Sequence, residues 1–531
     1  MIKILENNRI NCLLLSVIFL FLIYFINSSL SFNENDIKHW TTYNKDDIVF
    51  VYNSLLFLEG LEQHHTDHPS LLTFIIFPIF YKIAFYLGYI DFNNLTGFIN
   101  SDDINISLSK LFYISRLAIQ LISIFIILII YKISSHFSYR KSDSFFISLL
   151  FIFSTGFISA SNRIESGLIS VFFLLLAFLF FIKFLKHKDK KNIFYFIIVL
   201  IFIFSSLLQK KLVYFPLPFL FLSSVMFLSK NQFHYYRYKI LNFRYVHNCS
   251  LFLLYILVFA YFYLKTIDNN NADVSRDLDF IFLSFNFILI NLILFFYIKF
   301  FQNKIYENLL TYNLVFISTY FCYKYFLIFI FSANPEIWVI SFTNYFNHLN
   351  VFAGNSEIRD ANSFSNINLY LYQFLDNIIF IIKKYFFSIS YQSILVWTSV
   401  ILIASFFNRI SLRSKITIFF LFCGFFVVQS VILFRYEQDT YYLNSEFLLI
   451  FLISLLLVNI KKKIYYLIFV SLVIISSFSV NFVKINNLKK ANLESYCYLF
   501  KEFDSVDGFY QFYTKKIPLD VRKNFCKSSL I

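Results

Sequence analysis

The 531-residue sequence is poor in charge, glycine and proline. Asp, Glu, Lys and Arg together make up 15% of it, and there are only 8 glycines and 6 prolines. Hydrophobic residues account for 59% and aromatic residues for 22%. A water-soluble globular domain with this balance could not keep so much apolar area off its own surface. The composition therefore predicts an integral membrane protein with helical spans of about twenty apolar residues each.

Several common functional motifs are also missing. The sequence contains no Gly-rich phosphate loop, no H-E-x-x-H, no G-x-S-x-G and no soluble nucleotide-binding domain. These absences argue against ATP hydrolysis by this chain alone. The six cysteines show neither C-x-x-C nor metal-ligand spacing. Cys497 and Cys526 lie in the polar C-terminal tail, which we place outside the cytoplasm, and a disulfide between them is left open.

The distribution of basic residues indicates how the chain crosses the membrane. The net charge of +15 comes from residues scattered among short loops, which is typical of cytoplasmic loops and not of a nucleic-acid surface. Lys3 and Arg9 precede the apolar run Asn11–Leu30, which predicts a signal anchor with a cytoplasmic N-terminus. The next apolar stretch, Ser70–Ile90, can either cross the membrane or lie in its interface. Only the interfacial placement keeps basic loops such as Lys186–Lys191 in the cytoplasm, so we expect that placement.

The apolar runs predict an all-α polytopic membrane protein of about thirteen transmembrane helices. Its membrane domain covers residues 1–483, with a first external loop at 31–110 and a second long external loop at 333–388. Residues 484–531 form an external tail, opposite the N-terminus, and the expected location is the cytoplasmic (inner) membrane. After the first run, spans are predicted at about Leu111–Ile133, Ser144–Ser159, Gly167–Leu185, Asn192–Leu208, Leu212–Leu228, Cys249–Leu264, Asp279–Ile298, Leu309–Ser332, Ile389–Phe407, Ile416–Phe434, Phe447–Ile460 and Ile464–Phe482.

Charged and polar residues are concentrated in one external stretch, Tyr43–Pro69, which reads YNKDDIVFVYNSLLFLEGLEQHHTDHP. The pair Asp46–Asp47 suits a general base, because a neighbouring like charge and partial desolvation raise the pKa of one carboxylate. A solvated pair of loop carboxylates is the alternative interpretation.

The positions of these residues resemble the GT-C superfamily of membrane glycosyltransferases, which take a sugar from a polyprenyl-phosphate carrier. The likeness is to its protein O-mannosyltransferase, aminoarabinose-transferase and rhizobial galacturonosyltransferase branches. There, an acidic pair opens the first outer loop, a Gly closes the next helix, and a Lys/His-Pro-Pro-Leu element follows. The matching residues here are Asp46-Asp47, Glu59-Gly60 and His68-Pro69-Ser70-Leu71. Ser70 stands where the family has its second proline.

The resemblance implies a role for each matching residue. Asp46 is expected to be the catalytic base, and Asp47 to orient it or bind the acceptor. The expected ligands of the donor phosphate and lipid are His68, Lys210, Lys211, Arg435 and Tyr442. The expected substrate-binding residues are Glu59, His65, Asp67, Arg116, Arg163 and Glu165. For Arg163 and Glu165, which lie in the turn SNRIESG, an interfacial ion pair is the structural alternative.

The implied reaction is transfer of a sugar from a polyprenyl-phosphate donor to a glycan, lipid or protein acceptor at the outer face of the membrane. No cofactor is required by this scheme, although Asp46, Asp47 and Glu165 can provide oxygen ligands for a divalent metal. The expected partners are these substrates and membrane lipids, and not nucleic acid. Three alternatives remain open: a transporter or flippase, an O-antigen polymerase, and a structural or assembly protein. A transporter predicts broken helices and charges buried within spans; in the sequence only Lys324 is such a charge.

Overall fold

The computed structural model describes residues 11–19, 47–59, 70–99, 101–102, 104–137, 141–161, 163–186, 191–209, 211–228, 286–297, 305–331, 367–435, 442–457, 460, 469–477 and 479. Within these ranges every regular element is a helix, so the predicted all-α class is confirmed for the described part of the chain. The remaining predicted elements, including Cys249–Leu264 and the tail from residue 484, lie outside the described residues.

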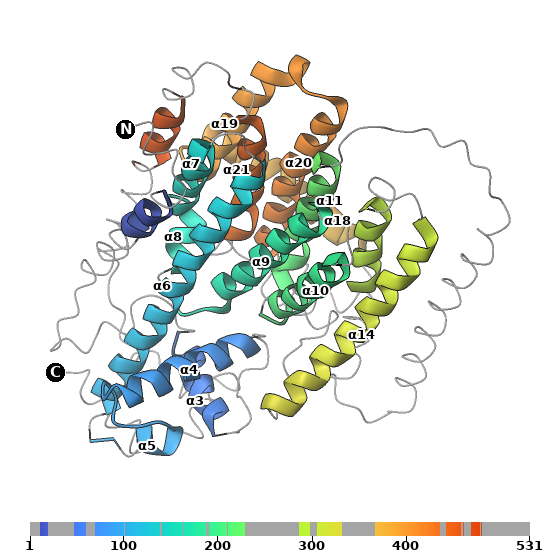
Figure 1. Cartoon of the computed structure of the whole chain (residues 1–531). Coiled ribbons are helices and arrows are strands. Elements are labelled where there is room, and N and C mark those ends of the chain that lie inside the picture. Colours follow the sequence, from blue (N-terminus) through green and yellow to red (C-terminus); the bar gives the residue numbers. More distant parts are fainter. Residues whose placement is uncertain are drawn as a thin grey trace.

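Figure 1 shows how the described helices pack side by side. Their bounds are α3 Asp47–Leu58, α4 Leu71–Tyr86, α5 Leu95–Ile99, α6 Ile104–Phe137, α7 Lys141–Ile152, α8 Thr155–Ser161, α9 Ser166–Lys186, α10 Lys191–Gln209, η2 Lys211–Tyr214, α11 Pro216–Leu228, α14 Ile305–Phe331, α18 Ile367–Phe387, α19 Tyr391–Phe406, η4 Phe407–Arg409, α20 Leu412–Arg435 and α21 Leu443–Leu457. Three further helical pieces cover 11–19, 286–297 and 469–477.

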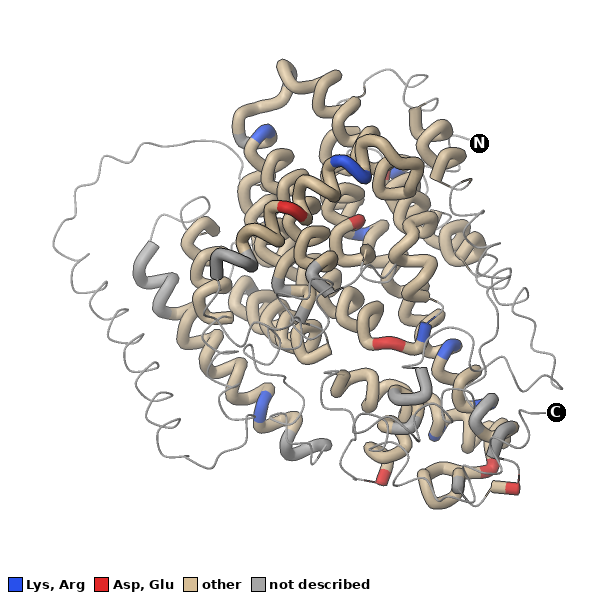
Figure 2. The backbone as a smooth tube through the Cα atoms, turned by 180° about the vertical axis from the view of Figure 1, so that it is seen from behind, with Lys and Arg blue, Asp and Glu red and all other residues tan. Residues whose placement is uncertain are grey.

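Four of the described helices are long and apolar enough to cross a membrane: Lys110–Phe137, Ser166–Lys186, Asn192–Gln209 and Ser414–Leu433. Two bent pairs, α7 with α8 and α18 with α19, raise this number to six if each pair is one span. Few of the described residues are charged, as Figure 2 shows. The helices are thus compatible with a multi-pass membrane protein, and the larger number of about thirteen spans stays a prediction.

The bundle has two ends that differ in what they contain. Because α6 and α9 end together, Lys186 Nζ lies 3.2 Å from His136 Nδ1; Lys183 is in the last turn of α9, and Lys132 is five residues before the end of α6. We name this the lysine end. At the opposite end, α3, α4 and α5 lie beside the start of α6 (Figure 1), and we name this the α4 end. The close pairing of α9 with α10 brings the end of α10 to the α4 end as well.

Helix α4 lies crosswise to the long α6 (Figure 1). Near its start, Thr73 Oγ1 donates a 2.8 Å hydrogen bond to Gln209 Oε1 on α10. Eight residues later, the Tyr81 hydroxyl is 2.6 Å from Ser115 Oγ on α6, so α4 bridges these two helices. The helix stops at Gly88, whose φ of +71° is favourable only for glycine. With 16 residues, α4 is shorter than the four candidate spans.

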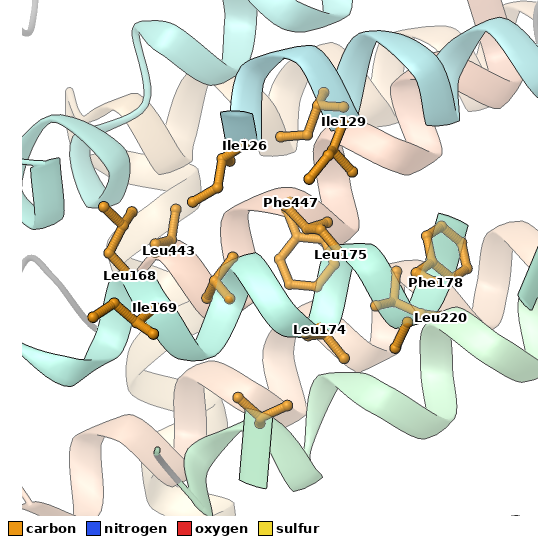
Figure 3. Close-up of a cluster of buried hydrophobic side chains, with 14 of the residues drawn as sticks. Ile126, Ile129, Leu168, Ile169, Leu174, Leu175, Phe178, Leu220, Leu443 and Phe447 are labelled. Atoms are coloured by element: carbon orange, nitrogen blue, oxygen red, sulfur yellow. The ribbon is translucent and has the colours of Figure 1, made fainter. Parts of the chain in front are cut away.

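A densely packed apolar core fills the space between α6, α9, α11 and α21 (Figure 3). Ile126 and Ile129 of α6 lie on the side of α9 where its Leu175 and Phe447 of α21 are seen. All of these side chains are buried. Because lipid tails are as apolar as leucine, tight van der Waals packing of this kind is what holds helices together in a membrane. The core therefore fixes α9 and α21 relative to each other.

The structure differs from the sequence prediction at three helices. The predicted span Ser144–Ser159 is bent by 64° between α7 and α8, because Ser154 Oγ accepts from the backbone N–H of Phe157 and caps a new helix. The expected loop 333–388 contains the 21-residue helix α18, which turns by 84° into α19. Helix α11 begins at Pro216, after a 3₁₀ turn, because proline is well suited to the first position of a helix.

Candidate functional site

The α4 end brings together elements that are far apart in the sequence. The Phe50 ring on α3 is 6.1 Å from the Phe74 ring on α4, and Thr73 of α4 is bonded to Gln209 of α10. Asp47 begins α3 one helical turn before Phe50, and Lys211 follows Gln209 by two residues. The backbones of Asp47 and Lys211 therefore both lie close to the first turn of α4, which directly follows the His68-Pro69 element in the sequence.

The turn between α8 and α9 lies at the same end. Two hydrogen bonds fix the antiparallel register of α9 and α10: Ser170 Oγ donates to the Ser206 carbonyl at 3.0 Å, and Ser206 Oγ donates to the Ser170 carbonyl at 2.7 Å. Glu165 lies five residues before Ser170 and Lys211 five residues after Ser206. Glu165 directly precedes α9 and Lys211 follows the end of α10 by two residues, so both lie at the same end of this helix pair.

The side chains of Arg163 and Glu165 do not form the ion pair that was the structural alternative for this turn. Arg163 is partly exposed, whereas Glu165 is 5% exposed. Glu165 Oε1 is buried and accepts no hydrogen bond within the described part of the chain. A buried carboxylate oxygen without a donor is costly and rare in folded proteins. Glu165 is thus the predicted site residue with the clearest capacity to bind a ligand.

Two other predicted site residues have structural contacts at this end. Arg116 is partly buried, with its guanidinium carbon 5.9 Å from the centre of the Phe112 ring. It lies in the interior of α6, which begins at Ile104. Glu59 Oε1 accepts hydrogen bonds from the Thr96 backbone N–H at 2.8 Å and from Thr96 Oγ1 at 2.9 Å, which ties the end of α3 to α5. The substrate contacts expected of both residues stay predictions.

A second polar centre, which the sequence did not reveal, surrounds Glu446 at the start of α21. Glu446 is 0% exposed. Its Oε1 accepts from Gln392 Nε2 of α19 at 2.7 Å, and its Oε2 accepts from the Gly156 backbone N–H of α8 at 2.9 Å. The Tyr391 hydroxyl donates to the Leu150 carbonyl of α7 at 2.6 Å. One carboxylate therefore joins the second halves of both bent helix pairs to α21.

A chain of hydrogen bonds continues from this centre toward α18. The Tyr385 hydroxyl donates to Gln429 Oε1 at 3.2 Å, and Gln429 Nε2 donates to Ser445 Oγ. Ser445 Oγ in turn donates to the Tyr442 carbonyl at 2.9 Å. Tyr442, predicted to bind the donor, is buried in this centre. In the sequence, the local sign of this centre is Glu446 at the end of RYEQDTYYLNSE, directly before an apolar run, but nothing there identifies its partners.

Replacing Glu446 by glutamine should destabilise the folded protein by about 1–2 kcal/mol. The glutamine carbonyl still accepts from the Gly156 N–H and the Gln392 amide can turn to accept from the new NH₂ group, so what is lost is the negative charge that strengthens both hydrogen bonds. We expect the melting temperature in detergent to fall by several degrees. Ser454→Ala on the same helix, which removes a buried hydroxyl without a hydrogen-bond partner, is the matched control and should change it little. A Glu446→Gln variant that melts with the wild type would contradict this role.

The side chains of the other predicted site residues lie outside the described part of the chain. Asp46, His65, Asp67, His68 and Lys210 lie outside the described residues. For Asp47, Lys211 and Arg435 the structure describes the backbone, at the starts of α3 and η2 and the end of α20. Within the described ranges no three His, Cys, Asp or Glu residues are grouped closely enough to hold a metal ion. The divalent metal considered for Asp46, Asp47 and Glu165 stays a prediction.

Comparison with known proteins identifies no relative of this chain. The chain matches no protein-family model, no curated protein and no solved structure. The likeness to the GT-C superfamily therefore depends on the motif residues of the sequence alone.

Proposed function

We propose that the chain is a membrane glycosyltransferase that moves a sugar from a polyprenyl-phosphate donor to a cell-envelope acceptor. One observation carries the proposal. The first turn of α4 is the meeting point of the start of α3, which carries Asp47, and the end of α10, which is followed by Lys210 and Lys211. Acidic and basic segments from distant parts of the sequence thus lie at one end of the bundle, as a transferase of a phosphate-linked sugar requires.

The position of α4 supports placing this end at the outer membrane surface. Its contact residue on α6, Ser115, lies about 33 Å along the helix from Phe137 at the lysine end, at 1.5 Å per residue. The hydrocarbon core of a bilayer is about 30 Å thick. With the lysine end in the cytoplasm, in line with the positive-inside rule, α4 lies in the opposite interface. This arrangement corresponds to the interfacial placement of Ser70–Ile90.

In the proposed reaction, Asp46 removes the proton from an acceptor hydroxyl or amine as that group attacks the anomeric carbon of the sugar. The bond between the anomeric carbon and the phosphate oxygen breaks, and the polyprenyl phosphate leaves with the bonding electrons. His68 and Lys210 stabilise the charge of the leaving phosphate, as cations at an interface can. Attack opposite to the leaving group inverts the configuration of the sugar.

A transporter of lipid-linked or anionic substrates is the second candidate, and one observation favours it. Transporters place substrate sites at discontinuous helices, and the structure contains two bent helix pairs joined by the buried Glu446. Neither the breaks nor the burial of Glu446 was predicted from the sequence.

Activity in detergent distinguishes the two functions, because a micelle has no sealed compartment. The purified chain is incubated with labelled polyprenyl-phosphate mannose, glucose, arabinose or galacturonic acid and with a cell-envelope extract as the source of acceptor. A transferase should move the label to the extract and release polyprenyl phosphate. Unchanged donor in detergent, together with movement of the intact donor across sealed proteoliposomes, would instead establish the transporter.

A further inference from the structure

Two fully or almost fully buried side chains at the α4 end have hydrogen-bonding atoms of opposite kind that are left unbonded. Glu165 Oε1 is an acceptor without a donor, and Gln209 Nε2 is a donor without an acceptor, within the described part of the chain. Glu165 is 5% exposed and Gln209 is 0% exposed. Buried polar groups are nearly always bonded in folded proteins, and here an acceptor and a donor are both left unbonded at the same end of the bundle.

The helix register places both side chains at one level of the bundle. Gln209 lies three residues after Ser206, and Glu165 lies five residues before Ser170, the two serines being bonded to each other. Both residues are thus within about 8 Å, along the helix axes, of the same pair of serines. Gln209 also holds the first turn of α4 through Thr73, so this level is that of the proposed active site.

The chemistry of the two atoms selects the class of ligand. A phosphate would be repelled by the Glu165 carboxylate, and a metal ion is not bound by an amide nitrogen that carries two hydrogens. A hydroxyl group both donates and accepts a hydrogen bond. A molecule with several hydroxyl groups can therefore donate to Glu165 and accept from Gln209 at the same time, and a sugar is such a molecule.

We propose that Glu165 and Gln209 bind hydroxyl groups of the sugar, and that their unbonded atoms are satisfied only when the sugar is present. That this sugar is the one being transferred depends on the proposed function, whereas sugar binding at this place does not. Glu165 and Gln209 are thus specificity-determining residues, and the charge needed for the lipid phosphate comes from other residues.

The test is the thermal stability of the purified chain in detergent with the methyl glycosides of mannose, glucose, galactose and arabinose. At least one glycoside should raise the melting temperature of the wild type. Glu165→Leu and Gln209→Leu should each weaken the apparent affinity for that glycoside about tenfold or more, since a buried hydrogen bond is lost. Glu165→Gln, which keeps a carbonyl acceptor, should retain part of it.

The protein without sugar provides a second readout that a purely structural role would not give. Glu165→Leu removes a buried oxygen that has no donor, so its sugar-free form should melt at the wild-type temperature or above. Asn313→Leu on α14 is the matched control, because both amide atoms of Asn313 are buried and unbonded, far from the α4 end. It should leave the response to the glycoside unchanged.

Three results would overturn the proposal: no glycoside stabilises the wild type, Glu165→Leu responds to the glycoside as the wild type does, or Glu165→Leu melts lower in the absence of sugar. The test of sugar binding and the test of sugar transfer can fail independently of each other. A chain that is stabilised by a glycoside through Glu165 but transfers no sugar from polyprenyl phosphate refutes only the transferase. Transfer that survives Glu165→Leu unchanged refutes only the sugar contact.

Discussion

Replacing Asp46 by asparagine should lower the rate of sugar transfer by about 100- to 10,000-fold, the range for loss of a general base. Asparagine has almost the shape of aspartate but cannot take up a proton near neutral pH. The measurement is release of polyprenyl phosphate by the purified chain in detergent, compared with surface glycan in a deletion strain that expresses the variant. Asp47→Asn should have a smaller effect if Asp47 only orients the base.

The choice of asparagine also tests the structural alternative for this pair. Asp46 directly precedes α3, which begins at Asp47, and a residue in that position commonly caps the helix. Asparagine caps a helix as well as aspartate does, whereas alanine does not. If Asp46 only stabilises α3, Asp46→Asn will be active and Asp46→Ala impaired. Asp91→Asn, an exposed acid in the turn after α4, is the control. Full rescue by both Asp46→Asn and Asp47→Asn would refute the catalytic role.

Replacing Gly156 by alanine should destabilise the protein by 3 kcal/mol or more and sharply reduce the amount of folded protein in the membrane. A Cβ atom at this position would meet the backbone nitrogen of Leu443, lie 2.7 Å from its Cα and lie 2.8 Å from Glu446 Oε2. Overpacking commonly costs about 1–3 kcal/mol. Here, backbone atoms cannot move aside, and the hydrogen bond to Glu446 would be lost as well.

Gly424 on α20 is the matched control for this substitution. A Cβ there would approach ring atoms of Phe219 at 2.6 and 2.8 Å, but that side chain can shift. Alanine is also favoured over glycine within a helix by about 1 kcal/mol. We therefore expect Gly424→Ala to yield folded protein with a melting temperature near that of the wild type. Equal yields and equal melting temperatures for the two variants would show that α8 does not pack on α21 as described.

Hydropathy predicted the long spans to within a few residues. The ranges Gly167–Leu185 and Asn192–Leu208 differ from α9 and α10 by one residue at each end. The apolar composition of such helices, which is set by lipid, marks their limits in the sequence. Helix α18 was missed because it is amphipathic. Its buried Asn377 and Tyr385 bond to α20, so its polar residues, which suggested a loop, are directed into the protein.

The break between α7 and α8 and the centre around Glu446 could not be predicted for a different reason. Neither glycine nor proline marks the break at Phe153-Ser154, and Gly156 comes only after it. Glu446 contacts Gly156 across 290 positions of sequence. A single sequence contains no signal for such a pair, since each residue alone has an ordinary local interpretation. The unbonded atoms of Glu165 and Gln209 likewise became visible only once burial and register were known.

The 34 residues of α6 would extend over about 51 Å, well beyond the 30 Å of bilayer hydrocarbon. With the lysine end at the inner surface, the turns before Ser115 rise about 16 Å above the crossing of α4 into the surrounding water. These turns would border one side of the proposed active site. A lipid-linked sugar donor could then enter the site at the level of the headgroups. A bulky polymeric acceptor would have to reach the site from the water, past these turns, with a flexible end. The two reactants would therefore arrive by separate routes.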